Sequence, residues 1–545
     1  MKSYNFSYRN VNKTSQLFND YVEGASELKS FYNLRPNLNN FKIQLNLKSK
    51  NYIKQNRDTL YSVINDQYKS IKNLNNSVKK NIELLKLDNT YTVCTGHQLS
   101  LLTGPIYFIY KIISTINLTK ILNKKYPEFN FIPIFWMATE DHDFDEISSF
   151  NFNGVNYKWN KKKSGPVGLL DIKGLERLFD LFFEKLEKDN LNSKYLIELV
   201  KDSYLKSSNL ADATRKLVNT IFGNKGIVII DSNEKRLKKI FEPYLLEEIR
   251  NKTSNRIINS TIENLKKKYG KSFKAQVNPR EINLFYLTKT NRERIIIEKN
   301  FYKIKNSNIN YDLDGIKKIL KTNPEFFSPN VLLRPLYQEI ILPNICYIGG
   351  PSEISYWLLL KDFFESQNVN YPILLNRNSA LIIDFKLSKK IKNLNIDLKD
   401  LFMEKNSLIN KKVREISNID LDLSFLKNKL DKQFKYLNEL VEKTDYSFKG
   451  SVDSEFKKQT ASINKLEKRL LKAQRKKLSD HVSRLSVIYE KLFPNGSIQE
   501  RKVNFTTFFQ IYGEQFINEL FKILDPLSNK FDVIIFDEEI DNKNV

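Results

Sequence analysis

The sequence predicts an α/β protein with a parallel sheet, followed by a helical arm. Residues 91–146 have the pattern of a strand, a helix and a second strand, and residues 344–376 show the same plan. Such β-α-β units place their strands parallel to one another. Over residues 423–492 apolar side chains recur three or four positions apart, with Lys and Glu between them. This spacing favours an antiparallel helical pair with a coiled-coil seam.

The first β-α-β unit carries two polar clusters. Tyr91–Cys94 is short and apolar, which predicts a buried strand, and Pro105 suits the first turn of the following helix. Phe131–Ala138 is the second apolar run. Gly96-His97-Gln98 and Glu140-Asp141-His142-Asp143 therefore follow the carboxyl ends of the two strands. Ligands of open α/β sheets bind at that edge.

The second unit repeats this arrangement. Asn344–Ile348 predicts a strand, Gly349–Glu353 a turn, and Ile354–Glu365 a helix. Tyr371–Leu375 predicts the next strand, which delivers Asn376-Arg377 to the same edge. We expect the four polar clusters to line one cavity at the carboxyl edge of a single sheet.

The remaining elements have weaker signals. The first 90 residues are expected to be mainly helical, and residues 150–159 predict a hairpin around Asn153-Gly154. Gly226–Ile230 predicts a strand that ends at Asp231, which serves either as a cap or as a substrate contact.

These patterns predict three parts of the chain. Residues 1–384 form the core, with insertions at about 149–205 and 273–330, the second of them antiparallel. Residues 385–495 form the arm, and residues 496–545 return to the core.

The arm is predicted to turn at or near Gly450-Ser451, where the apolar spacing is interrupted. One seam between two helices is too small to cover all of the arm's large side chains, which include Phe434, Tyr436 and Tyr489. We therefore expect a homodimer through the arm.

Composition narrows the class of protein. The chain has 545 residues, a net charge of +26 and two cysteines. Lys, Asn and Ile are abundant throughout, and no basic block carries interleaved aromatics, so the charge favours a solvated surface over nucleic-acid binding. Neither a secretory leader nor an apolar run long enough to span a membrane is visible. We expect a reduced, cytoplasmic protein without membrane contact.

The acidic block around His142 is the strongest chemical signal. Glu140, Asp141 and Asp143 crowd that histidine directly after a bulky apolar strand. The block is open to four interpretations: an amine or polyol site, Mg²⁺ held with a nucleotide, Zn²⁺, or a structural salt-bridge cluster. Zinc ordinarily requires more Cys or His ligands than this block offers.

Four further side chains allow a functional or a structural interpretation. His97 either faces phosphate oxygens or is a turn histidine bonded to the backbone. Arg334 and Arg377 each have the fork that binds a carboxylate or phosphate. Cys94 lies inside an apolar strand, which favours core packing over nucleophilic chemistry.

Several motifs together resemble one family. They are Thr95-Gly96-His97-Gln98, Leu102-Thr103-Gly104-Pro105-Ile106-Tyr107, Lys111, Phe135-Trp136, Glu140-Asp141-His142-Asp143-Phe144-Asp145-Glu146, Arg334-Pro335, Gly349-Gly350-Pro351-Ser352-Glu353, Tyr356-Trp357, Asn376-Arg377, Gln499-Glu500-Arg501 and Tyr512-Gly513. The set resembles the BshC family, the cysteine ligase of bacillithiol biosynthesis, over nearly the full length. Many members carry glutamine where this chain has His97.

The resemblance implies a Rossmann-type core, similar to nucleotidyltransferases and class I synthetases, with a coiled coil that makes a dimer. The implied reaction joins cysteine to glucosaminyl-malate, giving bacillithiol. By analogy with the cysteine ligase of mycothiol synthesis, ATP would activate the cysteine carboxyl, with Mg²⁺ accompanying the nucleotide and no structural metal.

We accordingly expect Glu140, Asp141 and Asp143 to orient the amine and accept its proton, and His142 to donate to or bridge them. Gly96, His97 and Lys111 are expected to hold oxygens of activated cysteine. The full set expected to bind substrate or nucleotide is Thr95, Gly96, His97, Gln98, Thr103, Gly104, Lys111, Trp136, Gly349, Gly350, Ser352, Glu353, Asn376 and Arg377.

Two rival functions remain open. One is a nucleotidyltransferase-like enzyme acting on another small molecule. The other is a non-catalytic, basic coiled-coil binding protein, which explains the charge and the seam but not an acidic block at a strand end.

Overall fold

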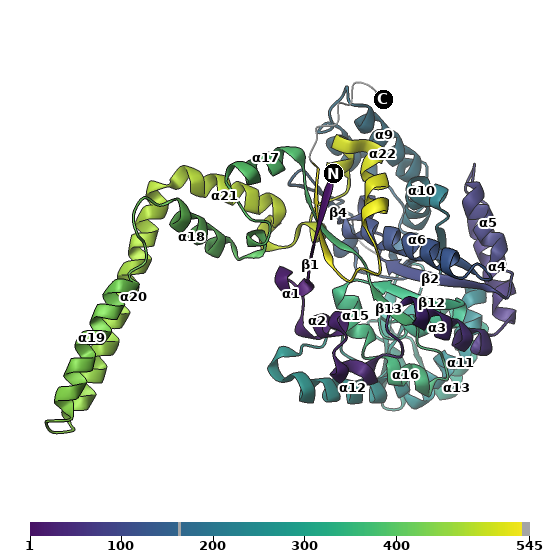
Figure 1. The fold of residues 1–545 in the computed structure, drawn as a ribbon. Coiled ribbons are helices and arrows are strands. Elements are labelled where there is room, and N and C mark those ends of the chain that lie inside the picture. Colours follow the sequence, from purple (N-terminus) through teal and green to yellow (C-terminus); the bar gives the residue numbers. More distant parts are fainter. Residues whose placement is uncertain (162–164, 537–545) are drawn as a thin grey trace. The chain divides into compact units, whose positions relative to one another are not determined.

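The computed structural model describes residues 1–161 and 165–536. Residues 1–381 and 500–534 form one compact unit, and residues 382–499 form most of a second (Figure 1). Residues 162–164 of the predicted first insertion, and the part of the predicted C-terminal segment beyond residue 536, lie outside the described residues.

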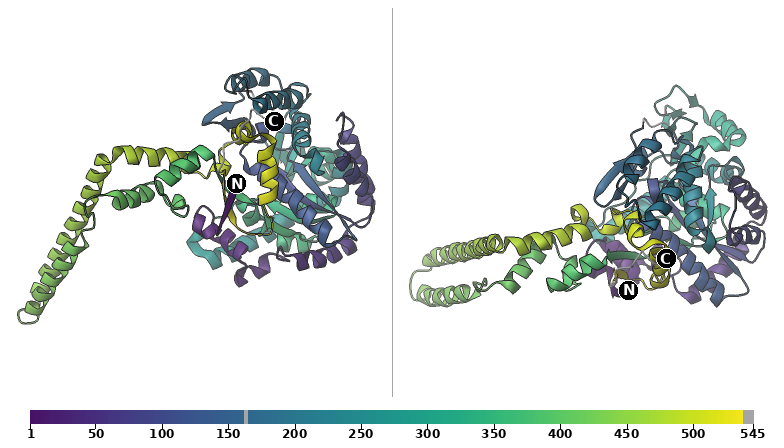
Figure 2. Two further views of the ribbon diagram at one scale, coloured as in Figure 1. Left: turned by 45° about the horizontal axis from the view of Figure 1, so that its top comes forward. Right: turned by 90° about the horizontal axis from the view of Figure 1, so that it is seen from above.

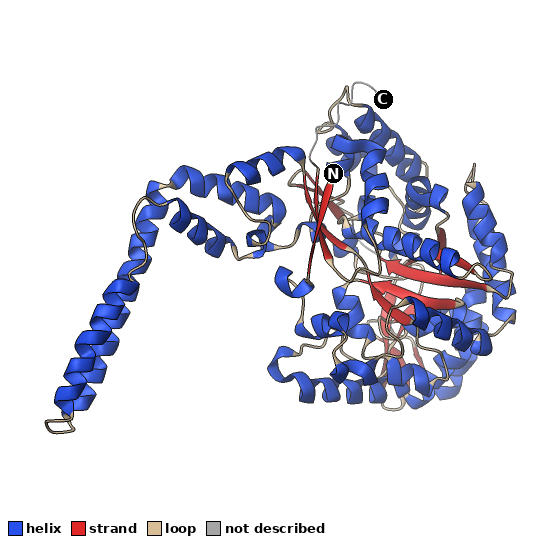
Figure 3. Ribbon diagram, viewed as in Figure 1, coloured by secondary structure: helices blue, strands red, loops and turns tan. Residues whose placement is uncertain are grey.

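A five-stranded parallel sheet organises the first unit (Figure 3). Its strands are β2 (Thr90–His97), β3 (Asn130–Met137), β6 (Val228–Asp231), β12 (Asn344–Gly349) and β13 (Ile373–Asn376), in the order β13-β12-β2-β3-β6. The predicted α/β class and parallel sheet are confirmed. Because the third strand in sequence lies at one edge and the fifth at the other, the order reverses between β2 and β12. That switch point is where doubly wound sheets bind ligands.

Helices cover the sheet and form the core with it. Helix α6 (Tyr107–Lys125) packs on β2 and β3, and α3 (Leu38–Asn51) packs on β12. Phe41 and Leu45 of α3 join strand residues such as Val93 in one buried cluster.

The helix predicted over Ile354–Glu365 is divided in two. Helix α15 (Pro351–Trp357) ends before α16 (Lys361–Ser366) begins. Three adjacent leucines at 358–360 are all buried between them. Consecutive helical residues point in different directions, so a turn lets all three reach the core.

The first insertion begins with the predicted hairpin. Strands β4 (Ser149–Phe152) and β5 (Val155–Lys158) pair antiparallel. Asn153 and Gly154 join them with φ values of 49° and 85°, as a two-residue hairpin turn with both φ angles positive requires. Helices α8 (Leu175–Phe183), α9 (Leu191–Val200) and α10 (Leu210–Phe222) follow.

The second insertion contains the predicted antiparallel strands. They are β7 (Leu284–Leu287), β8 (Arg292–Glu298), β9 (Phe301–Ile304), β10 (Asn310–Tyr311) and β11 (Phe327–Pro329), in the order β10-β9-β8-β7-β11. Helices α11 (Lys235–Asn251) and α12 (Thr253–Tyr269) precede this sheet, α13 (Leu313–Thr322) lies within it, and α14 (Arg334–Ile341) follows it.

The chain begins with a strand that the sequence did not predict. Strand β1 (Lys2–Phe6) belongs to a small sheet of order β1-β15-β14, with β15 at Phe531–Ile535 and β14 at Ser379–Ile383. Of the five β1 residues only Phe6 is buried, so the sequence lacked an apolar signal. Helices α2 (Gln16–Glu23), α4 (Gln55–Tyr68) and α5 (Asn76–Leu84) then follow as expected, and α22 (Thr506–Ile523) precedes β15.

The second unit is the helical arm. It contains α17 (Phe385–Asn393), α18 (Lys405–Ile416), α19 (Ser424–Val441), α20 (Phe448–Lys477) and α21 (Ser479–Leu492). Helices α19 and α20 lie side by side (Figure 2). Their seam contains Leu430, Phe434, Val441 and Val452.

The turn of the arm lies near the predicted Gly450-Ser451, a few residues earlier in the chain. Residues 442–447 connect α19 to α20, and Gly450 lies inside α20. Asp445 accepts a hydrogen bond from the Ser447 N–H, so the chain re-enters a helix before the glycine is reached. No helix in the described ranges is both long and apolar enough to cross a membrane.

Candidate active site

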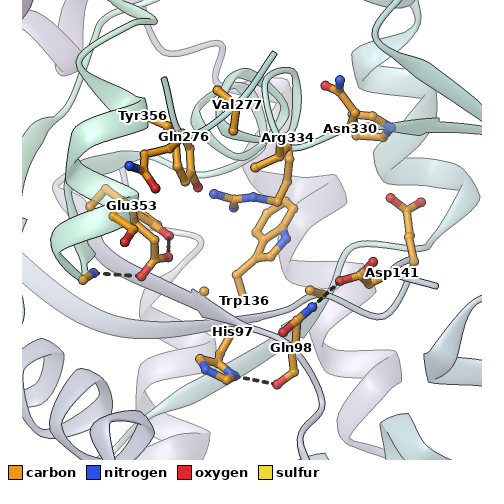
Figure 4. A pocket seen from close by; sticks show the side chains of 18 of the residues that line it. His97, Gln98, Trp136, Asp141, Gln276, Val277, Asn330, Arg334, Glu353 and Tyr356 are labelled. Atoms are coloured by element: carbon orange, nitrogen blue, oxygen red, sulfur yellow. Dashed lines mark hydrogen bonds between the residues drawn. The ribbon is translucent and has the colours of Figure 1, made fainter. Parts of the chain in front are cut away.

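A cavity of about 670 Å³ opens at the carboxyl ends of β2, β3 and β12 (Figure 4). All four predicted polar clusters contribute side chains or backbone to its wall. The expected single cavity is therefore confirmed. The predicted site residues that line it are Gly96, His97, Gln98, Lys111, Trp136, Glu140, Asp141, Gly350, Ser352, Glu353 and Arg377.

The other predicted site residues lie away from the cavity wall. They are Thr95, Thr103, Gly104, His142, Asp143, Gly349 and Asn376. The Thr95 hydroxyl donates to the Ile348 carbonyl inside the sheet, and the Asn376 amide donates to the Tyr8 hydroxyl. Both positions follow strand alternation, which directs neighbouring side chains to opposite faces.

Buried Lys111 and half-buried Glu353 form an ion pair at the switch point. Lys111 Nζ lies 2.7 Å from Glu353 Oε2 and 2.5 Å from the Gly96 carbonyl oxygen. Glu353 also accepts from the Tyr347 hydroxyl and the Gly350 N–H. Burial alone would raise the pKa of Glu353, but Lys111 and these donors bring it to about 2.

The Lys111–Glu353 pair bears on the prediction that Lys111 binds oxygens of activated cysteine. Lys111 and the Gly350 N–H, which could cradle an anionic ligand, are engaged by Glu353. A triphosphate at this point would require the Lys111–Glu353 pair to open. The predicted direct role of Lys111 toward activated cysteine therefore does not fit the closed pair.

His97 is a neutral residue with both ring nitrogens engaged. Nδ1 lies 2.8 Å from the Gln98 carbonyl oxygen, which can only accept, so Nδ1 carries the proton. Nε2 then accepts from the Tyr107 hydroxyl at 3.0 Å. Burial and the nearby Lys111 charge lower the pKa of His97 to about 4. The expected phosphate-binding role of this imidazole does not fit, and the turn-histidine alternative does.

Glu140 is tied into the second insertion. Its carboxylate accepts from Lys238 of α11 and from the Ser328 hydroxyl of β11. Lys238 is fully buried and also donates to the Phe327 carbonyl. This geometry makes Glu140 an anchor between the parallel sheet and the insertion, although it was expected to act on the amine.

Asp141 is the acidic side chain that faces the cavity with a defined orientation. Gln98 Nε2 donates to its Oδ2 at 2.7 Å, and the His142 N–H donates to its Oδ1 (Figure 4). Arg292 Nη1 lies 3.8 Å from the same Oδ1. These contacts hold the ionised carboxylate in place, and a quarter of the side chain stays exposed.

His142 contacts Asp141, one of the carboxylates it was expected to bridge, with its Nδ1 lying 3.7 Å from Asp141 Oδ1. Arg292 Nη1 lies 3.0 Å from His142 Nδ1. A guanidinium can only donate, so Nδ1 is an acceptor and the ring is neutral in this arrangement. In this arrangement Nδ1 accepts from Arg292, and the backbone N–H of His142 donates to Asp141.

Arg377 forms an ion pair with Glu500, which lies far from it in the sequence. Its two Nη atoms donate to both carboxylate oxygens of Glu500, at 2.8 and 3.0 Å. Both side chains are buried. Its Nε has no hydrogen-bond partner in the described structure, and the residue lines the cavity.

Sequence reasoning missed the cavity residues that come from the second insertion. They are Gln276, Val277, Asn278, Arg280, Phe285, Arg292, Pro329 and Asn330, and Val331 follows directly after them. It also missed the anchoring role of Lys238. Lys238 is one of 89 Lys and Arg residues, and nothing in the sequence next to it marks it as functional. Only the folded chain brings α11 and β8 close to β3. The pairing of buried Lys238 with Glu140 is visible only in three dimensions.

The fold and cavity define a doubly wound α/β protein with a ligand site at the switch point and a separate coiled-coil unit. Residues 1–378 match the family described as "Bacillithiol biosynthesis BshC, N-terminal Rossmann-like domain". Residues 380–536 match "Bacillithiol biosynthesis BshC, C-terminal coiled-coil domain". The chain belongs to the BshC family.

Similar proteins named "Putative cysteine ligase BshC" occur in several bacteria. The one from Flavobacterium johnsoniae is 48% identical over 97% of this chain and 98% of its own length. The protein from Christiangramia forsetii is 47% identical over 98% of this chain and 99% of its own length. The one from Cytophaga hutchinsonii is 32% identical, with 94% and 95% covered. The name of these relatives is that of a ligase, in agreement with the enzyme class that the motifs predict.

Proposed function

We propose that this chain joins L-cysteine to glucosaminyl-malate through an amide bond and so makes bacillithiol. The observation that carries the proposal is Asp141, a fixed carboxylate in a cavity at the switch point. Such a carboxylate can bind an amine as the ammonium ion; after that ion has lost one proton to solvent, the neutral amine attacks and transfers a second proton to the carboxylate as the C–N bond forms. The family and the names of the relatives support the choice of substrates.

The proposed reaction needs an activated carboxyl group. A free carboxylate has no adequate leaving group at neutral pH, so we propose ATP as co-substrate, with Mg²⁺ bound to its phosphates. Attack of the cysteine carboxylate on the α-phosphorus would give cysteinyl-adenylate and release pyrophosphate. The glucosamine amine would then displace AMP, and its proton would pass to Asp141. The fully engaged Lys111–Glu353 pair means that nucleotide binding would rearrange this part of the site.

Reconstitution with purified protein tests this proposal. Cysteine, glucosaminyl-malate, ATP and Mg²⁺ should give bacillithiol, detected by thiol labelling and mass spectrometry, and omission of ATP should stop product formation. A deletion strain should accumulate glucosaminyl-malate and lack bacillithiol. A strain that keeps its bacillithiol would contradict the proposed function, whereas ATP-independent synthesis would contradict only the activation step.

We also propose that the arm pairs with the arm of a second copy. Three aromatic residues are exposed on this part of the arm: Tyr436 of α19 by 62%, Tyr446 of the connection by 73% and Phe448 of α20 by 45%. Tyr436 and Phe448 line a groove that also contains Phe434 and Val452 of the seam. A symmetric partner would cover this apolar surface.

A further inference from the structure

Arg334 differs from the other enclosed basic residues of the cavity in having no carboxylate partner. Three cavity residues have paired charges: Lys111 with Glu353, Arg292 with Asp141, and Arg377 with Glu500. Within the described ranges Arg334 makes no ion pair, and its Nη1 donates to the neutral Gln338 amide at 3.0 Å. Arg280 and Arg501, which also line the cavity, are exposed, so water compensates their charges.

The surroundings of Arg334 favour the binding of an anion. The side chain extends into the cavity beside Trp136 (Figure 4), and its guanidinium carbon lies 5.6 Å from the centre of the Tyr347 ring. The position that a Cβ on Gly96 would occupy lies 3.6 Å from Arg334 Nη1, so the guanidinium lies close to the backbone at the end of β2. Aromatic walls lower the local dielectric constant, and a guanidinium does not lose its proton. Arg334 is half-buried, so water compensates its permanent charge only in part and a bound anion would complete the compensation.

We propose that Arg334 binds a substrate carboxylate, and that this carboxylate belongs to the malyl group of the acceptor. The planar fork of arginine matches a carboxylate with two parallel hydrogen bonds. This inference rests on the proposed function, because that function supplies two candidate carboxylates, one on cysteine and one on the malyl group.

The chemistry of the reaction separates these two candidates. The cysteine carboxylate is consumed, since its carbon becomes the carbonyl of the new amide. An arginine bound to it would lose its counter-ion during turnover. The malyl carboxylates keep their charge before and after the reaction. One acceptor molecule carries both groups, so its amine can reach Asp141 while its malyl end lies against Arg334 in the same cavity.

Calorimetry on the full chain tests the assignment without turnover. Glucosaminyl-malate, L-malate and L-cysteine are titrated separately into wild type, Arg334→Gln and Arg334→Lys. The control is Arg177→Gln, which removes an exposed arginine of α8 outside the cavity. Loss of a bidentate, charge-assisted contact should weaken glucosaminyl-malate binding about 10- to 100-fold in Arg334→Gln. Arg334→Lys keeps the charge and should lie between this variant and wild type, while cysteine binding and the control stay at wild-type values.

The outcomes separate this inference from the proposed function. A selective loss of cysteine binding, equal binding of glucosaminyl-malate by all variants, or no binding of either malyl compound by wild type would overturn it. Thermal unfolding identifies a variant that does not fold. If Arg334→Gln is such a variant, glucosaminyl-malate binding by Arg334→Lys is compared with that of wild type instead. If Arg334 governs acceptor binding but wild type makes no bacillithiol, only the proposed function fails. If Arg334→Gln makes bacillithiol with the wild-type KM for the acceptor, only this inference fails.

Discussion

Lys111 Nζ lies 2.7 Å from Glu353 Oε2, and these two residues are brought together from opposite halves of the parallel sheet. Lys111 belongs to the helix after β2, and Glu353 belongs to the helix after β12. The pair therefore joins the two β-α-β units at the switch point. Lys111 is almost fully buried, so its charge depends on this carboxylate.

The first prediction concerns the stability of this pair. Lys111→Met should lower the free energy of unfolding by up to about 3 kcal/mol, the lower end for a broken buried pair, because the Glu353 carboxylate that loses its cation is about a quarter exposed. Denaturant unfolding measures the change. Lys111→Met combined with Glu353→Gln should recover part of the loss, and a double variant less stable than Lys111→Met would contradict the prediction.

The pair should also contribute to acid stability. The pKa of Glu353 in the folded chain is about 2, below its ordinary value of 4.5. The unfolded chain therefore binds a proton first as the pH falls. Stabilisation is complete above about pH 4.5 and is lost as the pH falls toward 2. Compared with wild type, Lys111→Met should lose less additional stability over this interval, as denaturant unfolding at each pH would show.

Asp141→Asn tests the acidic residue of the cavity. The substitution keeps the shape but removes the charge that binds an ammonium ion and the oxygen that accepts its proton. Bacillithiol formation should fall by at least about 100-fold, the lower range for general-base catalysis. Circular dichroism and nucleotide binding should match wild type. Full activity in a folded Asp141→Asn protein would assign the acidic block a structural role.

His97→Gln should be tolerated. The imidazole is neutral above its pKa of about 4, and its Nε2 accepts from Tyr107. A glutamine oxygen can accept the same hydrogen bond. Turnover should remain within a factor of about three, a free-energy change below that of one hydrogen bond. His97→Ala, which leaves the Tyr107 hydroxyl without this acceptor, is the matched comparison and should lose more. A large loss in His97→Gln alone would show that the imidazole has a chemical role.

Removal of the end of the arm should change the oligomeric state. The arm begins and ends at one place, because the Ile382 N–H donates to the Gln499 side chain and that side chain donates back to the Ile382 carbonyl. Lys427 near the start of α19 contacts Glu467 in the C-terminal half of α20, so a short linker replacing residues 424–477 should leave the first unit folded. Light scattering should show a dimer for the full chain and a monomer for the shortened one. A monomeric full chain at micromolar concentration would count against pairing through the arm.

The sequence predicted the parts of the site that follow apolar strands. The runs at Tyr91–Cys94 and Phe131–Ala138 have the length and composition of buried strands, so their ends could be located. Side chains from the insertions could not. Arg292 reaches Asp141 only because β8 folds against the acidic loop, and no short-range pattern encodes that contact. Likewise, the role of Glu140 depended on Lys238, which is 98 residues away in sequence.

The pairing of Arg377 with Glu500 has a consequence for biosynthesis. The ribosome makes Arg377 123 residues before its partner, with the whole arm between them. At 5–20 residues per second this interval lasts roughly 6–25 s. During that time the nascent sheet carries a guanidinium whose buried position has no counter-ion. The catalytic half of the chain therefore reaches its final form only after the arm has left the ribosome, and a messenger truncated within the arm would yield an incompletely folded product.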